Sequence, residues 1–136
     1  MSCPYFYPVA RLEEDTWAVP PRLPLGDAYV GECRAGAEAY RPEDTLMRSS
    51  CNTGYARAFC ERFPHDARAD AVRFNIASDE GDGIRLQYIF EKECWPVDHG
   101  ELRYSVSAHA FTSAPADEIV RRQATVFLES YLRRAR

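Results

Sequence analysis

Apolar and polar residues alternate in three stretches of the second half of the chain. In the first, Val72, Phe74 and Ile76 are separated by polar side chains. A period of two is typical of strands with one buried face, and Gly- and Asp-rich turns favour antiparallel neighbours. We therefore predict a three-stranded antiparallel meander, with "ECWPVDHG" as the loop before its last strand. The predicted strands are Ala71–Ile76, Ile84–Lys92 and Leu102–Ala108.

The last 25 residues show the periodicity of an amphipathic helix. Thr112 or Ser113 is the predicted N-cap, and the acidic first turn and basic last turn suit the helix dipole. We expect the apolar face to cover the meander, because a three-stranded sheet must bury its apolar side. That face consists of Val120, Ala124, Phe127, Leu128, Tyr131 and Leu132.

The first half of the chain has many prolines and little periodicity, although Ala28–Val30 is a candidate strand. It contains too many large apolar residues for a solvated tail, so we expect it to be ordered and held by something other than hydrogen-bonded ladders. The predicted fold is α+β in a single domain, residues 1–136. Residues 1–66 form an irregular, metal-stapled segment, and residues 67–136 form the meander and helix.

Composition narrows the functional classes. The 136 residues carry a net charge of −4, and Lys92 is the only lysine. This balance disfavours nucleic-acid binding. There is no apolar run long enough for a membrane span and no secretory signal at the N-terminus. The expectation is a cytoplasmic protein that binds neither nucleic acid nor membrane.

Five cysteines in a chain expected to stay in a reducing compartment argue against a disulfide scaffold. Cys3, Cys33, Cys51 and Cys60 lie in the irregular half or at its border, separated by 29, 17 and 8 residues. Four thiolates complete either an iron–sulfur cluster or a zinc site. The sequence therefore predicts a metal centre on these four residues, alongside the simpler interpretation that they are buried, inert thiols.

The spacing distinguishes between the two metals. Structural zinc sites usually contain a tight C-x₂-C pair, and none occurs here. Loose spacing favours a [4Fe–4S] cluster whose corners are reached from separate loops, with zinc as the alternative. The cluster would serve electron transfer, redox sensing or stapling of the fold, with a redox or other protein as partner. The alternative from another class is a metal-free interaction module whose aromatic N-terminal half packs on a partner.

The residues around Cys51 and Cys60 suggest how the centre is surrounded. Asn52 or Thr53 could cap a helix and favour the Cys51 thiolate, and Tyr55 and Arg57 are the predicted outer shell around the cluster. A straight helix would place the backbones of the two cysteines about 13 Å apart, so the helix must be short. Further aromatic residues are expected to shield the centre: Tyr5, Phe6, Trp17, Tyr55 and Phe59.

Two other constellations compete with this site. Cys60 with His65, and Cys94 with His99, could form a Cys₂His₂ zinc site. Cys94, Asp98 and His99 could form a nucleophilic triad, but proximity in sequence is weak support for one. We otherwise expect Cys94 to be a core thiol beside Trp95. The sequence does not indicate an enzyme.

Overall fold

The structure, a computed structural model, describes residues 1–12 and 24–135. It is α+β, with one four-stranded and one two-stranded antiparallel sheet. The strands are β1 (Phe6–Arg11), β2 (Tyr29–Cys33), β3 (Ala71–Asp79), β4 (Gly83–Lys92), β5 (Trp95–Ser105) and β6 (Ala110–Ser113). The helical segments are α1 (Asp44–Leu46), the π-helical turn η1 (Met47–Cys51), the 3₁₀ turn η2 (Ala56–Ala58) and the long helix α2 (Glu118–Ala135).

The meander is present but has four strands, in the order β3-β4-β5-β6. The alternating positions lie on one buried face, where Val72, Phe74, Ile84, Leu86 and Leu102 are among the core residues. The predicted third strand, Leu102–Ala108, starts and ends later in the sequence than the observed strand β5. β5 ends at Ser105, and the chain returns through His109, in a left-handed conformation, to form the extra edge strand β6.

The predicted loop "ECWPVDHG" is wrong, because β4 and β5 are joined by a two-residue turn. Glu93 and Cys94 both have positive φ, 52° and 67°, as the tightest hairpin turns require. Pro96 is accommodated by a register shift that places Pro96 opposite Glu91 and Asp98 opposite Phe90. The shift leaves Val97 as the extra residue of a bulge, and bulges are among the few places where a strand tolerates proline.

The C-terminal helix starts later than predicted. Thr112 and Ser113 belong to β6, and α2 begins at Glu118. The N-cap is Asp117, whose Oδ1 accepts hydrogen bonds from the backbone N–H groups of Ile119 (2.9 Å) and Val120 (3.1 Å). Within the described residues, no helix has both the length and the apolar character needed to cross a membrane.

The N-terminal half is more regular than the sequence suggested. The candidate strand at Ala28–Val30 is confirmed by β2, which pairs with β1. β1 escaped prediction because Pro8 interrupts its alternation. The pairing shifts register just after Pro8, and the Arg122 side chain donates to the Pro8 and Val9 carbonyl oxygens at 2.6 and 2.9 Å.

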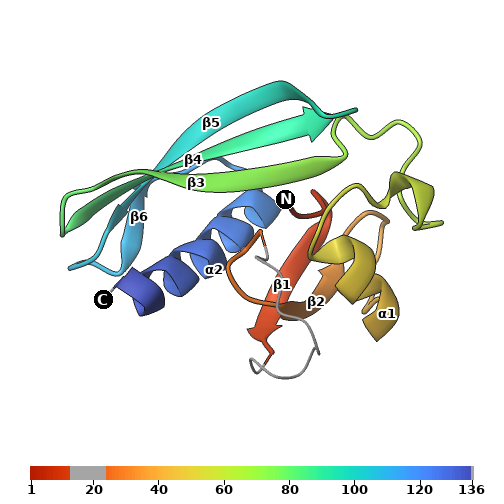
Figure 1. Cartoon of the computed structure of the whole chain (residues 1–136), viewed down its shortest axis with the longest axis horizontal. Helices are drawn as coiled ribbons and strands as arrows, with labels where there is room; N and C mark the ends of the chain where they lie inside the picture. Colours follow the sequence, from red (N-terminus) through yellow and green to blue (C-terminus); the bar gives the residue numbers. More distant parts are fainter. Residues whose placement is uncertain (13–23, 136) are drawn as a thin grey trace.

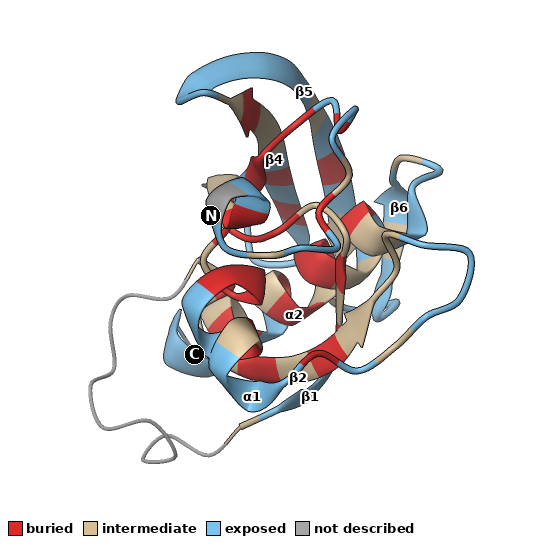
Figure 2. Ribbon diagram, turned by 90° about the vertical axis from the view of Figure 1, so that its right-hand side faces the viewer, coloured by how far each residue is buried: buried red, intermediate tan, exposed pale blue. Residues whose placement is uncertain are grey.

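Helix α2 lies between the two sheets (Figure 1). One side covers the four-stranded sheet, as predicted: the Phe127 and Phe74 rings are 5.8 Å apart. Another side faces the N-terminal half, where the Tyr29 hydroxyl donates to the Val126 carbonyl oxygen at 3.2 Å. The buried residues therefore line both sides of the helix (Figure 2). This explains why its buried set includes two polar residues, Gln123 and Ser130.

Gln123 fixes the start of the chain in the interior. Its Nε2 donates to the carbonyl oxygens of Cys3 (2.8 Å) and Phe6 (2.7 Å), and its Oε1 accepts from the Ser2 hydroxyl (2.7 Å). The backbone of Ser2 also exchanges two hydrogen bonds with Val72, at 2.7 and 2.8 Å. Ser2 and Gln123 are both fully buried. The first residues are therefore held between the helix and the edge of the sheet.

Replacing Gln123 with Leu should destabilise the protein by about 3 kcal/mol, because buried carbonyl groups of Cys3 and Phe6 lose their donor. The free energy of unfolding in urea measures this. Arg121→Ala, an exposed change on the same helix, should cost little. Equal effects of the two substitutions would contradict a special role for the buried amide.

Candidate metal centre

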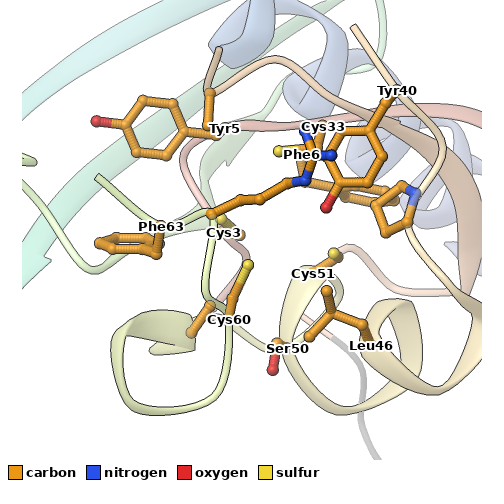
Figure 3. A pocket seen from close by; sticks show the side chains of 14 residues that line it. Cys3, Tyr5, Phe6, Cys33, Tyr40, Leu46, Ser50, Cys51, Cys60 and Phe63 are labelled. Atoms are coloured by element: carbon orange, nitrogen blue, oxygen red, sulfur yellow. The ribbon is translucent and has the colours of Figure 1, made fainter. Parts of the chain in front are cut away.

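Cys3, Cys33, Cys51 and Cys60 line one pocket in the N-terminal half of the structure. Figure 3 shows the four side chains together with the rings of Tyr5, Tyr40 and Phe63. The four residues come from different parts of the fold: before β1, the end of β2, the end of η1, and the residues after η2. All four are free thiols.

Backbone hydrogen bonds position Cys3 and Cys33. The Cys3 N–H donates to the Cys51 carbonyl oxygen at 3.1 Å, which joins the start of the chain to the end of η1. Cys33 pairs with Tyr40 through two hydrogen bonds, at 2.7 and 3.2 Å, which close the loop between them. The Arg34 N–H donates to the Tyr5 carbonyl oxygen at 2.9 Å. These contacts hold the loops carrying Cys3 and Cys33 side by side.

The chain reverses direction between Cys51 and Cys60. The expected helix from Asn52 is absent: Cys51 ends η1, and Gly54 and Tyr55 have positive φ, 78° and 57°. A Cβ at position 54 would lie 2.9 Å from the Ala71 side chain, so glycine is needed there for space as well as conformation. The reversal brings both cysteines to the pocket. Cys51 is thus at the C-terminal end of a helical turn, and the predicted N-terminal position is wrong.

Asn52 fixes the turn after Cys51. Its side chain accepts from the Tyr29 N–H and donates to the Tyr29 carbonyl oxygen, both at 3.0 Å. It also donates to the Met47 carbonyl oxygen at 2.9 Å. This fully buried amide therefore ties η1 to β2, and the predicted capping residue instead locks Cys51 beside the strand that ends in Cys33.

Burial dominates the electrostatics of the thiols. It raises the pKa of Cys3 and of Cys51 to about 12 and also raises the pKa of Cys33. The negative charges of neighbouring cysteines raise these pKa values further, since the four side chains lie close together. Backbone N–H groups act in the opposite sense: those of Tyr5 and Phe6 favour the Cys3 thiolate, and that of Ala35 favours the Cys33 thiolate.

Arg62 is the only charged residue lining the pocket among the described residues. Its guanidinium lies 3.8 Å from the centre of the Tyr40 ring, and its charge lowers the pKa of Cys33. The cavity measures about 20 Å³, which is enough for about one water molecule. Sequence reasoning missed Arg62, Tyr40 and Phe63, because only the tertiary fold brings these three residues to the cysteines.

Of the residues predicted to surround the centre, Tyr5 and Phe6 line the pocket, whereas Tyr55 and Arg57 do not. The Tyr55 hydroxyl donates to Glu91 and accepts from the Cys94 N–H, both at 3.0 Å. The Arg57 Nε donates to Asp70 at 2.8 Å. Phe59 is 75% exposed, so its predicted shielding role is wrong. Trp17 lies outside the described residues, so its predicted role stays a prediction.

Cys94 is exposed in the β4–β5 turn, and its neighbour Trp95 is 75% exposed, so the predicted core thiol is wrong. Cys60 lines the four-cysteine pocket, whereas His99 lies within β5. In the described part of the chain, no three His, Cys, Asp or Glu side chains are arranged to bind a single metal ion. The Cys₂His₂ arrangement is therefore not formed in this structure.

No protein-family model, curated protein or solved structure matches the chain. Four thiols, an apolar lining and one guanidinium can bind a soft metal or metal cluster, or can simply pack as a buried core.

Raised thiol pKa values imply that the metal-free protein loses stability at high pH. The folded chain holds the Cys3 and Cys51 protons up to about pH 12, whereas an unfolded cysteine releases its proton near 9. The protonated thiols therefore contribute fully to the free energy of unfolding below pH 9, and this stabilisation is lost as the pH rises from 9 towards 12. Urea unfolding of metal-free protein at pH 8 and pH 10.5 should show the decrease. Cys3→Ala should reduce the difference between the two pH values, and an unchanged difference would contradict the assignment.

Proposed function

We propose that the chain binds one [4Fe–4S] cluster through Cys3, Cys33, Cys51 and Cys60. The proposal is carried by a single observation: four cysteines from four separate segments line the same pocket. Each could have been buried elsewhere in the core, and the remaining cysteine, Cys94, lies outside the pocket. Convergence of four thiols is the donor set that both cubane clusters and zinc require.

The arrangement favours the cluster over zinc. The four sulfurs of a zinc site lie about 3.8 Å from one another, as tetrahedral Zn–S bonds of about 2.3 Å require. The cysteines share a pocket, and their intervals of 29, 17 and 8 residues contain no tight C-x₂-C pair of the kind that structural zinc sites use. A cubane places four irons between its cysteines and so requires wider spacing. Because the present cavity is small, the loops that carry the thiols must move apart when the cluster is bound.

Several groups suit an anionic cluster. Its sulfur ligands are stabilised by backbone N–H donors, and Tyr5, Phe6 and Ala35 supply N–H groups that favour the Cys3 and Cys33 thiolates. Arg62 contributes one positive charge, and the rest of the lining is largely apolar, which limits access of water. A bound cluster supplies one-electron chemistry. With four protein ligands, its role is electron transfer or redox sensing, and it also staples the N-terminal half.

The metal-free interaction module fits the structure less well. That hypothesis assigns the aromatic residues of the N-terminal half to a partner surface. Instead, Phe6 and Tyr29 are buried within the chain, with exposed fractions of 1% and 3%. Among the residues that the structure describes, four large apolar side chains remain exposed: Val9, Phe59, Trp95 and Val97.

Metal analysis of protein purified without oxygen tests the proposal. We expect a brown protein with about four irons per chain and broad visible absorption. Cys51→Ser and Cys60→Ser should each lose most of the iron, whereas Cys94→Ser, a matched change outside the pocket, should retain it. Colourless protein with stoichiometric zinc would establish the other metal. Folded, metal-free protein would refute both.

Arg62→Gln should lower the reduction potential of the cluster by roughly 40 mV, the equivalent of about 1 kcal/mol for one electron. Reduction adds a negative charge to the pocket, and Arg62 is the only charged residue that lines the pocket among the described residues. Potentiometric titration followed by absorption measures the shift. Arg48→Gln removes an exposed charge from η1 that does not line the pocket, and should leave the potential nearly unchanged.

A further inference from the structure

The cysteine pocket has one wall in common with an open groove. The groove, of about 760 Å³, lies between residues 40–49 and residues 59–62. Four residues line both the pocket and the groove: Tyr40, Leu46, Cys60 and Arg62. In this shared wall the Arg62 guanidinium stacks on the Tyr40 ring, and Cys60 is itself part of the wall.

The four cysteines differ in burial. Cys3 and Cys51 are each 7% exposed, whereas Cys33 and Cys60 are only half-buried. Cys60 is the one cysteine that lines the groove as well as the pocket, and Cys33 is held against Tyr40 in the shared wall. By contrast, Cys3 is fixed on the far side by Gln123, at the centre of α2.

We propose that Cys60 and Cys33 form the access edge of the centre, through which iron arrives and leaves by way of the groove, while Cys3 and Cys51 form its buried anchor. This inference rests on the proposed function, because it assumes that the four cysteines bind a cluster. The matching ligand is a preformed [4Fe–4S] cluster carried by small-molecule thiols, because such a cluster already contains the sulfide that the proposed site needs. Such a carrier can occupy the groove and present its metal to Cys60 once the Tyr40–Arg62 pair moves aside.

Transfer from such a carrier is a ligand exchange. The bond between iron and the carrier's thiolate breaks, a bond between iron and the Cys60 Sγ forms, and the Cys60 proton leaves on the departing thiol. The oxidation state of iron does not change, so the step needs no oxidant or reductant. Repeating the exchange at Cys33 and then at the anchor cysteines replaces one carrier thiolate on each iron of the preformed cluster, and release runs in the reverse order.

Alkylation of the metal-free, folded protein tests the access edge without any metal. Iodoacetamide is added for graded times, and the occupancy of each cysteine is read by peptide mass spectrometry. Cys94, which is exposed, serves as the internal reference for full reactivity. We expect Cys60 and Cys33 to be alkylated next in rate after Cys94. Cys3 and Cys51 should react at least about tenfold more slowly than Cys60, because these two buried thiols become accessible only when the structure opens locally. Equal rates in a chain whose circular dichroism is unchanged would overturn the inference.

A second measurement uses the iron-loaded protein and the neutral chelator 2,2′-bipyridine. Ser49→Trp fills the groove from an exposed position that does not line the pocket, and should slow iron loss several-fold. Arg48→Trp, at the neighbouring exposed position outside the groove, is the matched control and should not. Equal release from both variants would overturn the groove as the route. If the protein never holds iron, the proposed function fails, and the alkylation order still decides whether the access edge exists.

Discussion

The buried amide of Gln123 is the contact on which the candidate site depends. It lies in the middle of a helix near the end of the sequence and binds three groups near the start, in Ser2, Cys3 and Phe6. A buried amide that lacks hydrogen-bond partners destabilises the folded state. The first residues of the chain must therefore follow a path that brings their polar groups to Gln123. Together with the bond from the Cys3 N–H to the Cys51 carbonyl oxygen, this path holds Cys3 beside the other cysteines.

The pocket combines two opposed requirements. Desolvation favours neutral thiols, which is why Cys3 and Cys51 hold their protons strongly. A metal needs thiolates, and the site provides only a few groups that favour them: N–H donors near Cys3 and Cys33, and the guanidinium of Arg62. If a metal binds here, most of the positive charge that balances four thiolates would have to come from that metal. In such a site, metal binding and deprotonation are a single coupled event.

Sequence reasoning recovered the elements whose signal is local. The strands around Phe74 and Leu86 and the helix face around Phe127 follow from periodicity, and the structure has them. It failed where tertiary contacts override local preference: Pro8 lies inside a strand, and Pro96 is accommodated by a bulge. The four cysteines were selected by ligand chemistry alone. Their shared pocket depends on the reversal at Gly54 and Tyr55, and no periodic pattern in the sequence indicates that reversal.

The bond between Gln123 and Cys3 also sets an order of events during synthesis. The last of the four cysteines, Cys60, is made well before the helix that anchors the first. Translation from residue 60 to residue 123 takes roughly 3 to 13 s at about 5–20 residues per second. During that interval the nascent chain carries four thiols that the helix has not yet brought together. The contact that fixes Cys3 can therefore form only after the helix that contains Gln123 has been translated.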